Sequence, residues 1–211
     1  MQGIKFRLLF LTFQIVFLFT VNKATCQKNI NMFVLDGSGF LQWEDYVEIG
    51  KTISIVLNPA AKSDSLINSY IQLHNPDYLQ LKYAINGTTI TNHVYKSLTK
   101  LLHQLKQADV ALLYISLIDG PAIDLKERLA IANQLGVKKI IVFLDRLDLV
   151  DSEEMIETCI NSAHLALSDS GFGFDDTYLI KGSFVKTKSN ISEDNPYLIS
   201  LVEMLVIISK I

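Results

Sequence analysis

Two short segments contain glycines of the kind that phosphate binding needs, and one of them also contains a lysine. A phosphate-binding loop has the pattern Gly-x-x-x-x-Gly-Lys-Ser/Thr between a strand and a helix, so that backbone N–H groups face anionic oxygens. Gly50-Lys51-Thr52 matches its end, but Asp45 stands where the first glycine belongs and a β-type run follows. We therefore interpret this tripeptide as a chance match. Asp36-Gly37-Ser38-Gly39 also permits close approach of a ligand to the backbone, yet Phe40 follows it and no lysine is available to meet phosphates.

Other kinds of chemistry find little support in the sequence. The histidines (His74, His93, His103 and His164) share no ligand spacing with a cysteine or an acid, so no metal site is predicted. No serine stands in a nucleophile elbow. Cys159 falls within a helical pattern and is expected to be a small buried apolar residue. We assign no catalytic residue from these patterns.

The elements that would position a site alternate between apolar β-type runs and helical runs. Strands are predicted over Asn31–Leu35, Thr52–Leu57, Leu79–Ile85, Val110–Leu117, Lys139–Leu144 and Tyr178–Ile180. Helices are predicted over Ser63–His74, Asn92–Gln107, Ile123–Leu135 and Asp151–Ser168. A last helix is predicted from Pro196, its first residue, to Ile211, with Asn195 as its N-cap. This order predicts a three-layer α/β/α fold around a mostly parallel sheet. Ligands of such folds bind where strands end, here after Leu35, Ile85, Leu117, Leu144 and Ile180.

The N-terminal 26 residues have the order of a secretory signal peptide. Lys5 and Arg7 precede the apolar run Leu8–Val21, and Ala24-Thr25-Cys26 offers a cleavage site. We expect residues 1–26 to be removed, leaving residues 27–211 as one secreted domain without a stable membrane anchor, because the run is shorter than the roughly 20 residues a membrane span needs. Two sequons, at Asn86 and Asn190, are candidate glycosylation sites on this route.

Composition excludes several classes of protein. The chain has 211 residues, 49% hydrophobic and 19% charged, which excludes a disordered chain. Its net charge is −3, and after loss of residues 1–26 the remaining 16 basic and 22 acidic residues give −6. An acidic surface repels phosphate backbones, so we expect no nucleic-acid partner.

The second half of the chain resembles the GTP-binding domain of elongation factor Tu, in the translational GTPase family. The resemblance rests on the segments Ala111–Pro121, Ala132–Val137, Ile140–Asp148, Asp175-Asp176-Thr177 and Lys181-Gly182-Ser183, in family order and spacing. It covers residues 109–211. It implies a P-loop GTPase-like fold, with GTP or GDP and Mg²⁺ as the ligands.

The resemblance implies a base-binding site that has lost part of its pattern. The family reads guanine with Asn-Lys-x-Asp, where this chain has Asp145, Arg146 and Asp148. Asp148 could accept the two guanine hydrogen bonds, and Arg146 could stack on the base. Asp145 can only accept where the family's asparagine donates, which disfavours guanine. Ser183 matches the family's Ser-Ala loop, but Phe184 replaces the alanine. We interpret these five residues as a vestigial nucleotide site.

The phosphate and catalytic parts of the family pattern are weaker still. The expected phosphate loop is Asp36-Gly37-Ser38-Gly39, without the lysine. The family's Asp-x-Pro-Gly-His segment aligns with the end of the strand at Tyr83-Ala84-Ile85-Asn86-Gly87, where neither proline nor histidine follows. A glycan on Asn86 would then lie where the phosphates belong.

Three hypotheses follow from these observations. The first is a secreted pseudo-GTPase that does not catalyse and acts by contact with a protein partner. The second is a protein that retains GTP or GDP binding through Asp148 and Ser183, with weak or no hydrolysis and phosphates held near Gly37 and Gly39. The third is a site that accepts amine-bearing bases because Asp145 is an acceptor.

Overall fold

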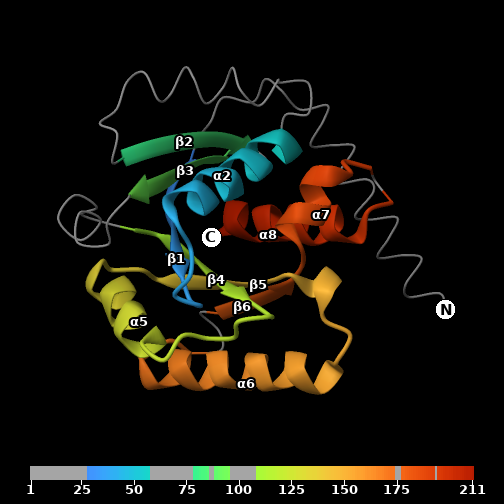
Figure 1. Ribbon diagram of the computed structural model, residues 1–211. Helices are drawn as coiled ribbons and strands as arrows, with labels where there is room; N and C mark the ends of the chain where they lie inside the picture. The colour runs from blue at the N-terminus through green and yellow to red at the C-terminus, as the bar shows by residue number, and fades with distance from the viewer. Residues whose placement is uncertain (1–27, 58–77, 86–87, 96–107, 174–176, 193) are drawn as a thin grey trace, which may run out of the picture.

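Six strands form one sheet in the order β2-β3-β1-β4-β5-β6, in which β2 alone is antiparallel to its neighbour (Figure 1). The computed structural model describes residues 28–57, 78–85, 88–95, 108–173, 177–192 and 194–211. The strands are β1 (Lys28–Asp36), β2 (Tyr78–Ile85), β3 (Thr88–Tyr95), β4 (Val110–Ser116), β5 (Lys139–Asp145) and β6 (Thr177–Lys181). The mostly parallel sheet expected from the sequence is thus present.

The central strands are apolar on both faces because helices cover both faces. Every residue of β4 is buried, and so are six of the seven residues of β5. On one face lie α2 (Trp43–Leu57), α7 (Phe184–Ser189) and α8 (Pro196–Lys210), and on the other α5 (Leu125–Gln134) and α6 (Glu153–Asp169) (Figure 1). The three-layer prediction is confirmed. In the described residues no helix is long and apolar enough to cross a membrane.

Helix boundaries in the second half follow local capping chemistry. The Asn195 side chain accepts the Tyr197 N–H at 3.0 Å and begins α8, as predicted. Ser152 accepts the Met155 N–H at 3.3 Å and begins α6. Gly136 has φ +75° just beyond α5, the left-handed conformation expected of a glycine after a helix end.

The strand predicted over Thr52–Leu57 is wrong, because these residues form the second half of α2. Ile49, Ile53 and Val56 are at most 4% exposed and share one helical stripe that faces the sheet. The β-branched residues had favoured a strand locally. Burial of a stripe with helical spacing overrides that preference.

The helix predicted over Asn92–Gln107 is wrong at its start. Residues 92–95 continue β3, pairing with β1 on one side and β2 on the other. Ile90 and Val94 enter the core, with Asn92 between them on the same face, which is the two-residue period of a strand. The rest of that prediction lies outside the described residues. So do the predicted helix Ser63–His74, the predicted signal peptide over residues 1–26, and Asn86.

The carboxyl ends of β1, β3, β4, β5 and β6 lie at one edge of the sheet. This carboxyl edge carries the loop between β1 and α2, the loop between β4 and α5, the short 3-10 turn η1 (Leu147–Leu149) after β5, and α7 after β6. Ile85 and Thr88 pair with each other, and Thr88 pairs with Lys28 at the start of β1. The carboxyl end of β2 at Ile85 therefore lies at the opposite edge, and the expectation that Ile85 ends a strand at the ligand edge is wrong. The reason is the antiparallel direction of β2.

Candidate functional site at the carboxyl edge

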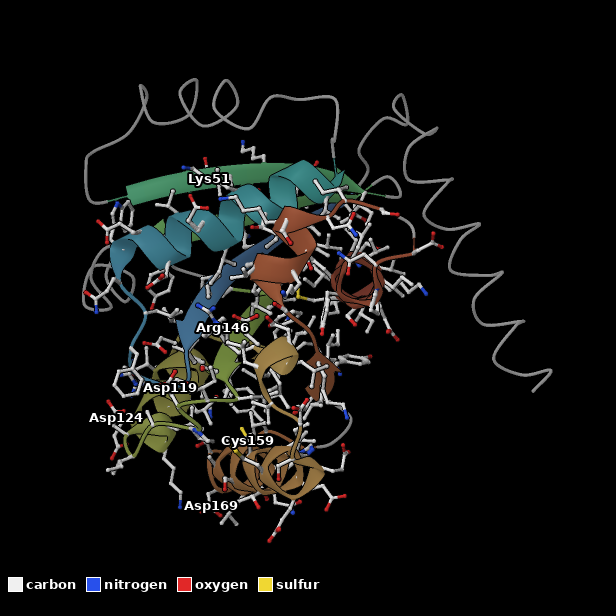
Figure 2. The ribbon with its side chains drawn as sticks, turned by 45° about the vertical axis from the view of Figure 1, so that its right-hand side comes forward. Lys51, Asp119, Asp124, Arg146, Cys159 and Asp169 are labelled. Carbon is white, nitrogen blue, oxygen red and sulfur yellow. The ribbon has the colours of Figure 1, made fainter. Side chains whose placement is uncertain are left out.

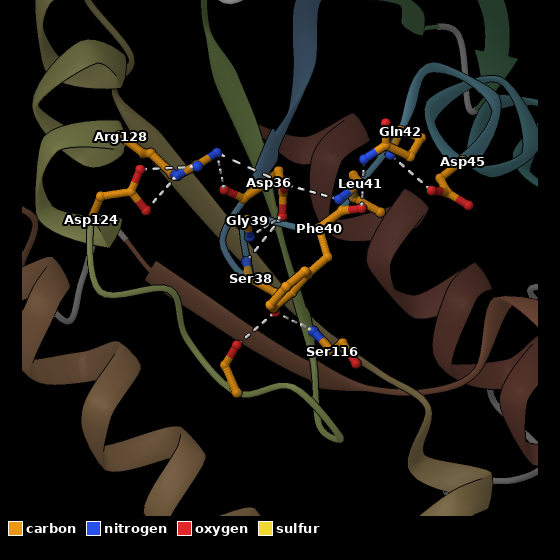
Figure 3. Close-up of polar contacts among 11 residues, drawn as sticks. Asp36, Ser38, Gly39, Phe40, Leu41, Gln42, Asp45, Ser116, Asp124 and Arg128 are labelled. Carbon is orange, nitrogen blue, oxygen red and sulfur yellow. Dashed lines mark hydrogen bonds and ion pairs between the residues drawn. The ribbon is translucent and has the colours of Figure 1, made fainter.

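The loop between β1 and α2 closes around the side chain of Asp36. The Asp36 carboxylate accepts backbone N–H groups from Ser38 (3.0 Å), Gly39 (2.7 Å) and Leu41 (2.9 Å) (Figure 3). Asp36 is only 4% exposed. The loop stands at the strand-to-helix junction where a phosphate loop would stand, and its inward N–H groups already have an anionic acceptor.

Arg128 of α5 supplies the counter-charge to this carboxylate. Its guanidinium lies 3.9 Å from the Asp36 carboxylate and donates to the Asp36 backbone oxygen at 3.3 Å. It also forms two hydrogen bonds of 3.0 Å with Asp124, which raise the pKa of Arg128. Tyr46 on α2 is near the same groups, and burial together with the Asp36 charge raises the pKa of its phenol. The guanidinium of Arg128 beside the loop is thus paired with the carboxylates of Asp36 and Asp124.

Ser38 fastens the loop to the neighbouring strand. Its hydroxyl accepts the Ser116 N–H at 2.8 Å and donates to the Gly120 oxygen at 2.7 Å. A second link runs through Gly37, whose N–H donates to the Tyr114 oxygen at 2.7 Å. A Cβ atom on Gly37 would lie 2.8 Å from that same backbone oxygen, so a larger residue cannot take this path without shifting β4. Packing against β4 therefore requires glycine here.

Gly50-Lys51-Thr52 lies inside α2, seven residues beyond its first residue. The N–H groups of a helix interior bond to carbonyls within the helix, so this tripeptide has none to offer a phosphate. Lys51 pairs instead with Glu48 at 3.1 Å. The interpretation as a chance match stands, although the strand expected after it does not.

Asp145, expected near the base, is buried, and its carboxylate already has hydrogen-bond partners within the protein. Its carboxylate accepts the Tyr114 hydroxyl at 2.7 Å and the Phe184 N–H at 2.8 Å, and Arg146 Nε lies 3.7 Å away. Burial, followed by the Asp145 charge, raises the pKa of Tyr114. The carboxylate thus ties β4, β5 and the start of α7 together.

Arg146 and Asp148 occupy an unusual turn after β5. Arg146 has φ +65°, the only positive φ among the described residues other than glycine. Asp148 lies in η1, and its Oδ1 is buried without a hydrogen-bond partner in the described part of the chain. This buried oxygen is therefore an acceptor of the expected base site that no described residue uses.

Ser183 and Phe184 serve the structure of α7. Ser183 is fully buried, and its hydroxyl accepts the Lys186 N–H at 3.1 Å as the helix cap. The Phe184 ring packs on Phe143, with ring centroids 4.5 Å apart, and at 6.3 Å from Tyr114. Phe184 therefore packs against side chains of β4 and β5 and lines the cavity at this edge.

A cavity of about 530 Å³ lies between α2 and α7 at this edge. Asp145, Arg146 and Phe184 line it together, whereas Asp36, Gly37, Gly39, Asp148 and Ser183 are not among its lining residues. Glu48 of α2 and Lys188 of α7 form an ion pair beside it, which lowers the pKa of Glu48. Of the residues expected to bind a nucleotide, only Asp145, Arg146 and Phe184 therefore line the same cavity.

Sequence reasoning missed Arg128, Tyr114 and the Glu48–Lys188 pair. Arg128 stands four residues after Asp124, a spacing that indicates a helical ion pair, but nothing in the sequence links it to Asp36. Tyr114 reads as one more residue of an apolar strand. In the described residues no group of three or more His, Cys, Asp or Glu side chains could hold a metal ion. Cys159 is 5% exposed, and burial raises the pKa of its thiol to about 11.

Comparison with known families agrees with this architecture. A family model described as "Elongation factor Tu GTP binding domain" matches residues 97–209, just over half of the chain. The match spans β4, α5, β5, α6, β6, α7 and nearly all of α8, and with them the residues of the expected base site. The six-stranded, mostly parallel sheet is that of a P-loop GTPase-like fold. The chain belongs to the family of the elongation factor Tu GTP binding domain, a translational GTPase G domain.

Proposed function

We propose that this G domain is a pseudo-GTPase: it neither hydrolyses GTP nor holds it tightly, and it acts by contact with a protein partner. The observation that carries the proposal is the Asp36 carboxylate inside its own loop, bonded to three backbone N–H groups. A β-phosphate placed there would compete for the same donors and meet a like charge at close range. Two such charges in a poorly solvated site repel strongly.

The absence of a phosphate-loop lysine at the start of α2 supports the same proposal. Gln42 and Trp43 stand at the start of α2, where a phosphate loop has lysine and a hydroxyl residue. The nearby cation, Arg128, is paired with Asp36 and Asp124. The described residues therefore do not fit a guanine nucleotide at its phosphate end.

A secreted setting completes the proposal. The basic, apolar and small-residue order of residues 1–26 supports export. Asn190, in the sequon Asn-Ile-Ser, is exposed after α7 and is accessible for glycosylation. Asn86 is the second candidate. Treatment of the protein from secreting cells with an N-glycosidase should shift its mass, and Asn190→Gln should remove part of that shift.

Titration of the full-length chain with fluorescent GDP and GTP, with and without Mg²⁺, tests the proposal. We expect no saturable binding below millimolar nucleotide and no GTP hydrolysis above the buffer rate. Micromolar binding that Asp148→Ala abolishes, or hydrolysis that it abolishes, would overturn the proposal. Asp151→Ala is a matched control, since this exposed carboxylate lies just beyond η1 and outside the expected base site.

One observation favours a second candidate function, residual guanine binding without a phosphate requirement. Asp148 Oδ1 is a buried acceptor without a partner among the described residues, and guanine offers two donors to such a carboxylate. If the base alone is held, guanosine and GDP bind equally and adenosine does not compete. Equal competition by adenosine would point instead to the third hypothesis, in which Asp145 favours amine-bearing bases.

A further inference from the structure

Several exposed apolar side chains lie in segments that follow the carboxyl ends of strands. Six large ones in the described residues follow a carboxyl strand end: Phe40, Ile118, Ile123, Leu149, Met155 and Val185. In a domain that holds a polyanionic ligand at this edge, polar and cationic groups would be expected there. The apolar surface indicates a different occupant.

Two of these side chains border a groove between the loop after β4 and the first turns of α6. The groove has a volume of about 430 Å³. Ile118, 50% exposed, borders it on the loop side, and Met155, 42% exposed, borders it on the helix side. Leu117 and Cys159, both nearly buried, also line it. We call this feature the α6 groove. It is large enough to receive an apolar side chain and its neighbours.

The charged residues that line the α6 groove are acidic. They are Asp119 on the loop and Glu154 on the helix, and neither forms an ion pair with another described residue. Asp151 and Glu157 add exposed acids on α6 or just before it. Figure 2 labels Asp119 on the loop after β4 and Cys159 on α6, which both line the groove. A segment that fills this groove is favoured if it carries positive charge beside its apolar side chains.

The loop side of the groove is fixed in place. Leu117 N–H donates to the Asp145 oxygen at 3.0 Å, and Gly120 N–H donates to the Ser116 oxygen at 2.8 Å. The Ser38 hydroxyl holds the Gly120 oxygen from the closed β1–α2 loop. A groove that is formed before its partner arrives loses less conformational entropy on binding.

We propose that the α6 groove is the docking site for a basic, apolar segment of a protein partner. An apolar side chain of that segment enters between Ile118 and Met155, while lysine or arginine beside it pairs with Asp119 and Glu154. This inference rests on the proposed function, since it gives the chemistry of the partner that a pseudo-GTPase would contact.

The test uses the full-length chain and a fluorescein-labelled amphipathic helical peptide built only from leucine and lysine. Fluorescence anisotropy measures its affinity at low salt. We expect saturable binding that Ile118→Ser or Met155→Ser weakens at least about tenfold. Leu165→Ser, at an exposed apolar residue of α6 outside the groove, should change affinity by less than about twofold. Equal weakening by Leu165→Ser, or no saturable binding, would overturn the inference.

Charge is tested separately. The same peptide with glutamate in place of every lysine should not bind, and the double variant Asp119→Asn, Glu154→Gln should lose most of the salt dependence seen with the natural chain. Equal binding of the glutamate peptide would refute the charge argument. Nucleotide titration keeps the two proposals apart: micromolar GDP binding removes the pseudo-GTPase proposal, whereas failed peptide binding without nucleotide binding removes the groove proposal alone.

Discussion

Replacing Asp36 tests the closed loop most directly. In Asp36→Ala, three N–H groups lose a charged acceptor, from Ser38, Gly39 and Leu41. Hydrogen bonds to charged groups contribute about 1.5–3 kcal/mol each, but water can replace the acceptor at the two less buried donors. Ser38 is 3% exposed, so water cannot replace the lost acceptor and its N–H is left buried without a hydrogen bond. We therefore expect the free energy of unfolding to fall by about 3 kcal/mol.

Urea denaturation followed by circular dichroism measures this loss. Asp36→Asn should lie between Asp36→Ala and the natural chain, because an amide oxygen can still accept from Ser38 and Gly39 while its NH₂ group opposes the Leu41 N–H. Asp45→Ala is the matched control. Asp45 accepts a single N–H, from Gln42 at 2.8 Å in an exposed setting, and its removal should cost about 0.5–1 kcal/mol.

An added anion provides the second arm of the experiment. Inorganic phosphate should stabilise Asp36→Ala more than it stabilises the natural chain, compared at equal ionic strength in chloride, because the freed N–H groups then have an external acceptor. If Asp36→Ala loses less than about 1 kcal/mol, or gains nothing from phosphate beyond the natural chain, the carboxylate does not fill the loop and the reasoning fails.

Three other substitutions address the core, an ion pair and the thiol. Asn92→Leu should raise the free energy of unfolding by about 1–3 kcal/mol, since both polar atoms of this fully buried amide lack a partner among the described residues; a lowered denaturation midpoint would contradict this. Glu48→Gln should cost at most about 1 kcal/mol at pH 7, because the pair with Lys188 is half-exposed. The ion pair lowers the pKa of Glu48 in the folded protein. Its contribution to the free energy of unfolding is therefore complete above the pKa of the unfolded chain, near 4.5, and disappears as the pH falls through the pKa of the folded protein. A difference in stability between Glu48→Gln and the natural chain that stays constant from pH 6 to about 3 would refute this. In a Cys26→Ser background, Cys159 should react slowly with a disulfide reagent at about pH 8, where roughly one thiol in a thousand is ionised for a pKa of about 11; rapid reaction would show that the thiol is open to solvent.

The second half of the fold could be predicted because the secondary structure that its local sequence favours is the one that its tertiary packing requires. β4 and β5 are continuous apolar runs, and Asn195 and Gly136 mark helix ends by chemistry that needs no distant partner. The first half resisted prediction where the two disagree. The residues from Thr52 to Leu57 are rich in β-branched side chains, yet the sheet beneath them requires a helix to bury Ile53 and Val56.

The structure brings together only part of the nucleotide site expected from the sequence. Asp145, Arg146 and Phe184 do meet around one cavity. The sequence could not reveal that Asp145 is used internally by Tyr114 and the Phe184 N–H, or that Asp36 turns back into its own loop. Those arrangements depend on side-chain directions and on contacts between distant segments, which single-residue patterns do not encode.

The position of β1 in the sheet has a consequence for the order of folding. It is the first strand among the described residues, yet both its neighbours, β3 and β4, begin 60 or more residues later. A nascent chain therefore carries an apolar strand with both edges unpaired until β3 has emerged, and with one edge unpaired until β4 has emerged. The hydrogen bonds that join the closed loop to Tyr114 and Ser116 cannot form before then. Contacts between segments so far apart in sequence form slowly, because a long loop must be closed first. During synthesis, this strand of the sheet's interior therefore needs protection from aggregation until its neighbours arrive.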